Sequence, residues 1–205
     1  MDEKVIKSIN EARWADGQTV WNRLEDITFN PMQSQEEFVM RLIRENAKTA
    51  FGRNHGFEFI RSMEEYRQRI HVTTYEDYIQ YIERIVNGER NVLTAYQTEH
   101  LSLHHGYKVL PQSRWGVQLY NDYNFCAMFY IAGNHGLLTD GMVLNLVDNH
   151  LEQLPSGVCK GNLLGRLLIR REFDHNQLYV IPVEIPRHPL GTNFHYLQAL
   201  YALKQ

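Results

Sequence analysis

The sequence predicts an α/β protein, in which a helical N-terminal part is followed by a mixed sheet flanked by helices. Three observations support this class. Apolar residues recur at spacings of three and four through residues 4–27, and capping signatures precede further helical segments up to Gly88. Beyond Gly88, strand-like segments are interleaved with helical ones. Such interleaving is typical of a sheet covered by helices.

The first two helices are expected on either side of residue 30. Residues 4–27 form the first, and Gly17 is expected to interrupt or kink it. Ser34 with Glu37 has the spacing of a capping box, which places the start of the second helix there, and Gly52 supplies its stop. The apolar stripe of that helix consists of Phe38, Leu42 and Ile43.

Two shorter helices are expected before Gly88. Ser62 with Glu65 repeats the capping signature, and Thr74 with Asp77 does so less perfectly. The helix after Thr74 ends at Asn87–Gly88. Its three tyrosines are expected to pack the helix and to form hydrogen bonds through their hydroxyls: Tyr75, Tyr78 and Tyr81.

The second half of the chain supplies the sheet. Strands are expected at residues 100–105, with one face buried, and at 141–149, 166–173 and 177–185; helices are expected at 113–136 and 191–205. No internal repeat or linker interrupts the sequence. We therefore expect one domain over residues 1–205, mainly helical over 1–88 and α/β over 89–205.

Composition excludes several classes of protein. Hydrophobic residues make up 43% of the chain, and the formal net charge is -3, which argues against a nucleic-acid partner. No apolar run approaches the roughly 18 to 20 residues of a membrane span, and the N-terminus has no signal-peptide pattern. The two cysteines, Cys126 and Cys159, are not expected to form a disulfide, because we expect a cytoplasmic protein.

Several segments follow one another in a familiar order. They are "ENAKTAFGRNHGF", "VTTYEDYIQYIERIVNGE", a strand, a glycine-containing loop with Lys108 and Pro111, then "SGVCKGNLLGRLL", "YVIPVEIP" and "NFHYLQALYAL". This order resembles the N-terminal part of the auxin-responsive Gretchen Hagen family of acyl-acid amido synthetases, which are relatives of the acyl-adenylate-forming enzymes. The resemblance runs from about residue 35 to the end, and the tyrosine-rich helix is its most specific part.

The resemblance implies part of a large adenylating domain that binds ATP and a carboxylic acid. Its phosphate loop is rich in Ser, Thr and Gly, and it precedes the lysine and proline that match Lys108 and Pro111. The corresponding positions here form a degenerate nucleotide-binding loop, with Ser102, His104, His105, Gly106 and Lys108 as the candidate residues. Because Gly106 is the single glycine left, the backbone cannot easily turn successive N–H groups toward one anion.

We therefore expect a truncated homologue that adenylates nothing by itself and acts as a binding or interaction module. The alternative is half of a split ATP-dependent amido synthetase that needs a second chain. No catalytic residue and no cofactor are expected, although ATP and Mg²⁺ belong to the alternative. A homodimer or a partner protein chain is expected, and a small carboxylic acid is a candidate ligand; nucleic acid and membrane are not expected partners.

Other candidate groups have a simpler interpretation. Three histidines lie close in sequence, but a strand points His100 and His104 one way and His105 the other, so no metal site is expected. Arg166, Arg170 and Arg171 are interpreted as a solvated strand edge more than as an anion site. One aromatic set is interpreted as core more than as the lining of an acyl pocket: Trp115, Tyr120, Tyr123, Phe125, Phe129 and Tyr130.

Overall fold

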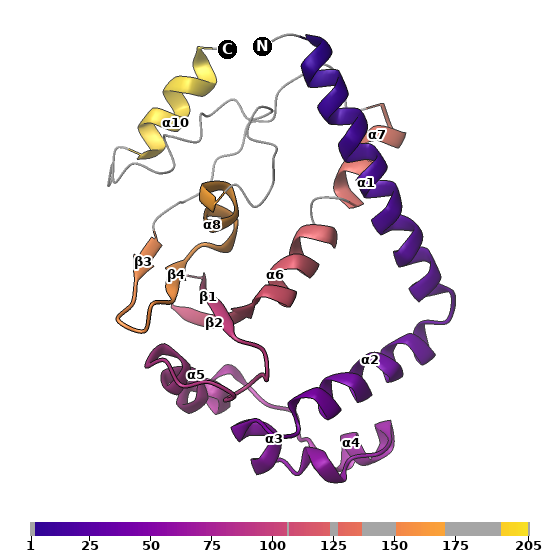
Figure 1. Cartoon of the computed structure of the whole chain (residues 1–205), viewed down its shortest axis with the longest axis vertical. Coiled ribbons are helices and arrows are strands. Elements are labelled where there is room, and N and C mark those ends of the chain that lie inside the picture. The colour runs from indigo at the N-terminus through magenta and orange to yellow at the C-terminus, as the bar shows by residue number, and fades with distance from the viewer. Residues whose placement is uncertain (1–2, 106, 124–126, 137–150, 171–193, 205) are drawn as a thin grey trace. The chain divides into compact units, whose positions relative to one another are not determined.

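The computed structural model of the chain describes residues 3–105, 107–123, 127–136, 151–170 and 194–204 (Figure 1). Two compact units share these residues. The first comprises residues 1–21, 119–152 and 160–205, and the second comprises 22–118 and 153–159. Each unit is described by itself below. The expected single domain over residues 1–205 stays a prediction.

Among the described residues, the elements before the first strand are all helices. Strands and helices both follow it. In chain order the elements are α1 (Glu3–Phe29), α2 (Pro31–Asn46), α3 (Ala50–Asn54), the 3-10 helix η1 (Phe57–Phe59), α4 (Met63–Arg69), the 3-10 helix η2 (Tyr75–Tyr78), α5 (Ile79–Val86), β1 (Thr98–His104), β2 (Lys108–Ser113), α6 (Arg114–Asn121), α7 (Ala127–Asn134), β3 (Leu151–Gln153), β4 (Cys159–Gly161), α8 (Leu163–Arg170) and α10 (Phe194–Leu203). The strands form a sheet in the order β2-β1-β4-β3. The predicted α/β class, with a mixed sheet flanked by helices, is confirmed.

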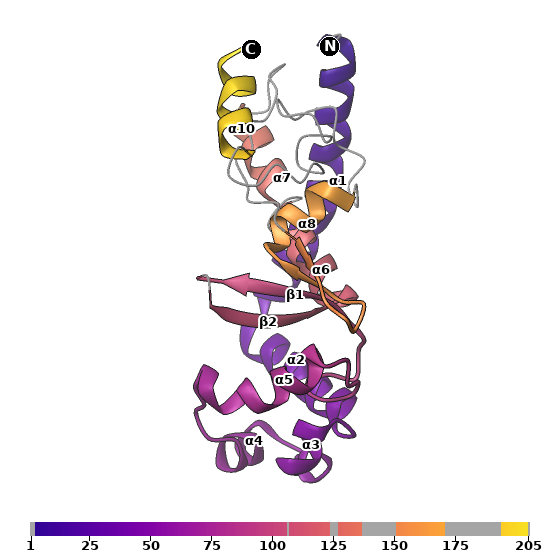
Figure 2. The same cartoon turned by 90° about the vertical axis from the view of Figure 1, so that its left-hand side faces the viewer.

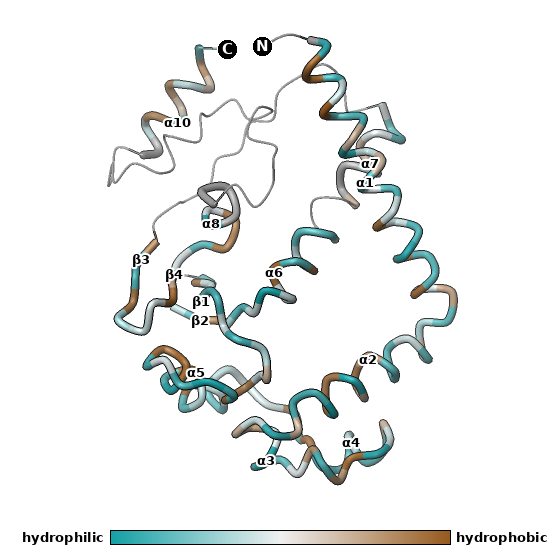
Figure 3. The backbone as a smooth tube through the Cα atoms, viewed as in Figure 1, coloured by the Kyte–Doolittle hydropathy of each residue, from teal (hydrophilic) through white to brown (hydrophobic). Residues whose placement is uncertain are grey.

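Helices α1 and α2 differ from the sequence prediction at two glycines and one serine. Helix α1 runs through Gly17 without a break, so the expected interruption is wrong. Helix α2 begins at Pro31, whose fixed φ suits the first helical position. Ser34 therefore lies inside α2, where its hydroxyl donates to the carbonyl oxygen of Ile27 over 2.7 Å. Both helices show hydrophobic residues recurring among hydrophilic ones (Figure 3).

The stop assigned to Gly52 is also wrong, because α2 ends at Asn46 and Gly52 belongs to α3. Thr49 caps α3, and its Oγ1 accepts a hydrogen bond from the Gly52 amide over 2.9 Å. Asn46 stabilises the corner between α2 and α3. Its side chain donates to Leu42 O over 2.7 Å and accepts from the Ala95 amide over 2.8 Å. The corner needs glycine because the backbone of α3 approaches that of Asn46 closely.

The capping signatures at Ser62 with Glu65 and at Thr74 with Asp77 are confirmed. Ser62 caps α4 by accepting from the amide of Glu65, whose carboxylate accepts in turn from the Arg61 amide. The amide of Thr74 donates to Asp77 Oδ2 over 2.8 Å at the start of η2. Helix α5 ends at Val86 with Asn87 as its C-cap, and Gly88 follows with a positive φ of 91°.

The core of the second unit has two parts. Met40 and Ile43 of α2 pack with Ile60, whereas Tyr81 and Ile85 of α5 belong to a larger cluster. The other buried members of that larger cluster are Ala50, Val92, Leu101 and Leu154. Helix α2 thus buries a face that includes Met40 and leaves Phe38 40% exposed, so the predicted stripe is only half correct.

Strand β1 was expected to bury one face and expose the other. The strand is confirmed, but His100, Leu101 and Ser102 are all buried, and Leu103 is exposed. Both faces of β1 are therefore covered at its centre, and both are exposed at the end near the turn, where Leu103 and His104 are exposed. Figure 2 shows the β1–β2 hairpin on one side of the cluster formed by α2, α3, α4 and α5.

In the first unit, a helix replaces an expected strand. Residues 163–170 form α8, whereas the sequence predicted a strand at 166–173. The Asn162 side chain accepts from the Gly165 amide over 3.2 Å, which is a helix cap. Arg166 is fully buried rather than solvated at a strand edge. The helix expected at the C-terminus is confirmed by α10.

The described residues cover only part of the other elements predicted for the second half of the chain. Within the expected helix at 113–136, the structure has α6 and α7, and residues 124–126 lie outside the described residues. The strands expected at 141–149 and 177–185 also lie outside them. Among the described residues, no helix is long and apolar enough to cross a membrane.

Candidate functional site

The predicted nucleotide loop is the tight turn of a β-hairpin. Strands β1 and β2 pair antiparallel, and His104 stands opposite Lys108, so only residues 105–107 connect them. His105 adopts the left-handed conformation with a φ of 50°. The Tyr107 amide donates to the His104 carbonyl over 3.3 Å. Gly106 lies outside the described residues.

Lys108 is held among aromatic rings. Its Nζ lies 5.4 Å from the centroid of the Tyr75 ring and 5.7 Å from that of Tyr107. Both distances fall in the range of cation–π attraction. The negative faces of these rings therefore attract the ammonium group.

The structure gathers some of the predicted site residues and separates one of them. His104 and His105 lie at the exposed hairpin tip with ring centroids 4.7 Å apart, and Lys108 stands across from them. Ser102 is further down the strand, opposite Leu110, and is 5% exposed. Its hydroxyl has no hydrogen-bond partner among the described residues. Whether these residues bind a nucleotide stays a prediction.

The outer edge of β2 is blocked against further strand pairing. Tyr75 OH accepts a hydrogen bond from the Val109 amide over 2.8 Å and lies 3.5 Å from the Val109 carbonyl oxygen. Pro111 has no amide hydrogen to offer. Because β2 is a terminal strand of the sheet, these residues protect an edge that a second chain would otherwise extend.

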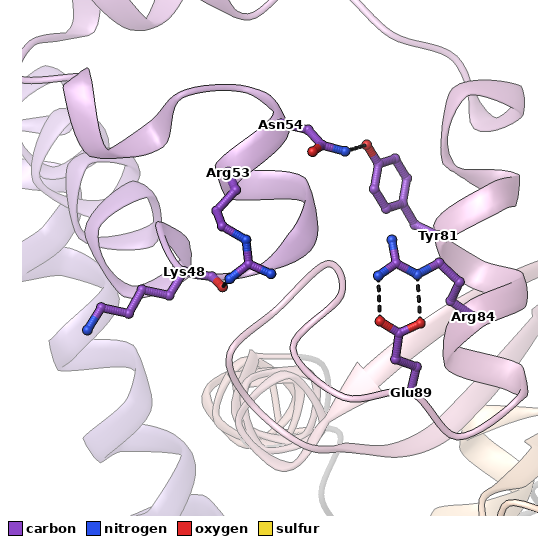
Figure 4. A network of polar contacts seen from close by, with 6 residues as sticks. All are labelled: Lys48, Arg53, Asn54, Tyr81, Arg84 and Glu89. Carbon is purple, nitrogen blue, oxygen red and sulfur yellow. Dashed lines mark hydrogen bonds and ion pairs between the residues drawn. The ribbon is translucent and has the colours of Figure 1, made fainter.

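The predicted structural role of the three tyrosines is confirmed. Tyr75 bonds to β2 as described, the Tyr78 hydroxyl lies 2.7 Å from Thr73 Oγ1, and Tyr81 OH accepts from Asn54 Nδ2 over 3.0 Å. Figure 4 shows the last contact, which joins α5 to α3. The sequence therefore indicated correctly that these hydroxyls are used within the fold.

A bidentate ion pair closes the turn after α5. Arg84 Nε donates to Glu89 Oε2 over 2.7 Å, and Arg84 Nη2 pairs with Glu89 Oε1 (Figure 4). The hydrogen bond from Arg84 lowers the pKa of Glu89 below its usual value. Any stability from this shift is present above the ordinary glutamate pKa and is lost as the pH falls. Because both side chains are exposed, the pair supports the turn only weakly.

The predicted aromatic set does not form one lining. Trp115 stacks with Phe38 and Tyr96 in the second unit, at centroid distances of 6.0 and 6.2 Å. Tyr130 stacks between Trp14 and Trp21 in the first unit, at 5.8 and 5.6 Å. Phe125 lies outside the described residues, and nothing is described of the Phe129 side chain.

Sequence reasoning missed a groove between the end of α1 and the exposed face of α2. It has a volume of about 640 Å³, and its lining includes Ile27, Phe38, Arg41 and Arg44. The sequence did contain a signal, since Ser34, Phe38 and Arg41 share the helix face opposite Ile43. The prediction placed Phe38 in the buried stripe of α2, and the groove on this face was therefore not predicted.

Among the described residues, no three His, Cys, Asp or Glu side chains gather closely enough to hold a metal ion.

Comparison with known proteins identifies the family of the chain. A family model described as the GH3 family N-terminal domain matches residues 20–205. The chain belongs to the GH3 family. The resemblance inferred from the sequence is thereby confirmed.

Solved structures agree with this assignment. A GH3.15 acyl acid amido synthetase superposes on the GH3 chain with a TM-score of 0.71 and 23% identity, covering 88% of this chain and 32% of its own. A structure described as AtGH3.15 acyl acid amido synthetase in complex with 2,4-DB gives 0.68 and 19%, covering 80% and 30%. The GH3 chain thus shares their fold and spans about a third of their length. No curated protein matches the sequence.

Proposed function

We propose that this GH3 chain is a non-catalytic binding module that uses the family fold without adenylating a carboxylic acid. The observation that carries the proposal is the hairpin tip, where a three-residue turn joins β1 to β2. The resemblance assigns the family's phosphate loop to this turn. A triphosphate needs several backbone N–H groups turned toward it. So short a turn, with a single glycine, offers few of them.

The state of Lys108 supports the same proposal. The Lys108 ammonium already lies 5.4 Å from the centroid of the Tyr75 ring and 5.7 Å from that of the Tyr107 ring. Moving it to an anion would cost these contacts. The proposed module therefore needs no ATP or Mg²⁺, and it acts in the cytoplasm by binding a protein chain, with a small carboxylic acid as a further candidate ligand.

Calorimetric titration of the chain with Mg²⁺-ATP tests the proposal. We expect no saturable heat beyond dilution from the wild-type chain or from Lys108→Ala, because the turn does not surround a phosphate. Lys160→Ala is the matched control, since Lys160 is a lysine on β4 that pairs with Glu152 over 2.9 Å. Micromolar binding that Lys108→Ala abolishes and Lys160→Ala retains would contradict the proposal and favour half of a split ATP-dependent synthetase.

A further inference from the structure

The loop that follows α5 lines a small polar pocket. The lining comprises residues 88–98 of the loop, Ile85 of α5, and Ser156 and Val158 from the segment between β3 and β4. The pocket has a volume of about 290 Å³, and all of these residues belong to the second unit. We infer that this pocket binds a small oxyanion, either a phosphate or a short carboxylate, through Arg90, Thr94 and Ser156. The inference goes beyond the proposed function, because it involves neither the hairpin tip nor a protein partner.

The charges in the lining leave a cation without a partner. Glu89 is the acidic residue of the lining, and both of its carboxylate oxygens are already bound by Arg84 (Figure 4). Arg90 is exposed and forms no ion pair or hydrogen bond with any residue that the structure describes. The guanidinium group of an arginine always carries its charge and has five N–H donors. The pocket therefore offers an uncompensated positive charge to an anion.

Two hydroxyl groups add hydrogen-bond donors to the same lining. Thr94 Oγ1 accepts from the Tyr96 amide over 3.2 Å, and its own hydrogen has no acceptor among the described residues. Ser156 Oγ is buried and has no hydrogen-bond partner within the described part of the chain. A buried hydroxyl without a partner is costly. With at most a rotation about the single side-chain torsion of Ser156, an oxyanion in the pocket supplies the missing acceptor.

The backbone of the loop also favours an anion. The carbonyl oxygens of Asn91 and Val92 accept from the amides of Ala50 and Phe51, over 2.8 and 2.9 Å, at the start of α3. Asn91 adopts the left-handed conformation with a φ of 55°. The amides of Arg90 and Asn91 have no hydrogen-bond partner among the described residues. A left-handed residue in a turn directs successive N–H groups toward one anion, as in the phosphate-binding turns of other proteins.

The size of the pocket limits the ligand. Sites for drug-sized ligands have volumes of about 300 to 1,000 Å³, so this pocket of about 290 Å³ suits a phosphate or a short carboxylate better than a nucleotide. Ile85 and Val92 are buried and form part of the lining. Such apolar walls strengthen the attraction between a guanidinium group and an anion. The expected absence of ATP binding is therefore compatible with this site.

Titration followed by nuclear magnetic resonance tests the site. The whole chain is titrated separately with sodium phosphate and with sodium acetate, while sodium chloride keeps the ionic strength constant. We expect saturable shifts of the amide signals of residues 88–98 and of Ser156, with a dissociation constant of about 1 mM. Arg90→Gln removes the charge and is expected to raise that constant about fivefold or more. Saturation by phosphate, by acetate or by both identifies the ligand chemistry.

Ser156→Ala separates a role in binding from a role in folding. Because its hydroxyl has no partner within the described fold, we expect the midpoint of urea unfolding to stay unchanged. The dissociation constant of the anion is expected to rise about threefold or more. A variant that loses stability and keeps the wild-type affinity would show that the hydroxyl serves the fold alone, against the inference.

Arg67→Gln is the matched control, since Arg67 is an exposed arginine in the last turn of α4 and lies outside the lining. It should keep the wild-type affinity, and so should Lys108→Ala, which distinguishes this site from the hairpin tip. Signals that do not saturate with either anion, or an Arg90→Gln protein that binds as tightly as Arg67→Gln, would overturn the inference. The Mg²⁺-ATP titration does not depend on this result, so the two proposals can fail separately.

Discussion

Replacing Gly52 with alanine is expected to lower the free energy of unfolding by about 3 kcal/mol. A Cβ at Gly52 would overlap the carbonyl oxygen of Asn46 and lie 3.0 Å from its carbonyl carbon and 3.1 Å from Ala47 Cα. All three are backbone atoms, so no rotation of a side chain relieves the overlap. The corner between α2 and α3 has to open, and Asn46 and Thr49 then lose the hydrogen bonds that close it.

Urea denaturation of the wild-type chain and the variant measures this loss. Gly116→Ala is the matched control, because Gly116 also lies in a helix but its added Cβ would meet the ends of side chains, 3.3 Å from Gln112 Oε1 and 3.7 Å from Ser113 Oγ. We expect the control to stay within about 1 kcal/mol of the wild type. A Gly52→Ala protein as stable as the control would show that the corner tolerates a side chain.

Replacing Tyr75 with phenylalanine is expected to cost about 1 kcal/mol of stability and to expose the edge of β2. The substitution removes the hydroxyl that accepts from the Val109 amide, and it keeps the aromatic ring beneath Lys108. The freed amide then faces solvent or a second chain. Hydrogen exchange measures this most directly, and the Val109 amide should exchange faster while the central amides of β1 keep their protection.

Tyr107→Phe is the control for this prediction. Tyr107 is also a tyrosine with its ring near Lys108, but it is exposed, and no hydrogen bond of its hydroxyl is found among the described residues. Its substitution should change neither stability nor exchange at Val109. If the two variants behave alike, the hydroxyl of Tyr75 does not protect the strand edge.

Capping patterns predicted helix starts correctly where no neighbouring residue favoured a different start. Ser62 with Glu65 and Ser34 with Glu37 have the same spacing, yet only Ser62 caps a helix. Pro31, three residues before Ser34, had already set the helix start. A capping pattern is therefore ambiguous when a proline precedes it closely.

The error at residues 166–173 has a different physical origin. A run of leucine and isoleucine suits a buried strand and a buried helix equally, because periodicity does not separate them in a short apolar segment. The side chain of Asn162 accepts a hydrogen bond from the Gly165 amide, and this cap favours the helix over a strand. The capping asparagine, three residues before Gly165, is the local feature that distinguishes the helix from a strand here.

The candidate site depended on contacts between distant segments. The sequence located the hairpin and the hydroxyl bonding of the tyrosines, but it did not pair Tyr75 with Val109, which lies 34 residues away. It also missed the contact of Tyr107 with Lys108. The exposure of Phe38 followed from which face of α2 meets the core, and a single sequence does not specify that choice.

We propose that this GH3 chain does not adenylate carboxylic acids. Acid-dependent exchange of labelled pyrophosphate into ATP tests it most directly, because formation of an acyl-adenylate is reversible. With a panel of aromatic and aliphatic carboxylic acids, we expect exchange no greater than that of a sample without protein. Exchange that requires one of the acids and disappears in Lys108→Ala would contradict the account and make the chain a working part of a synthetase.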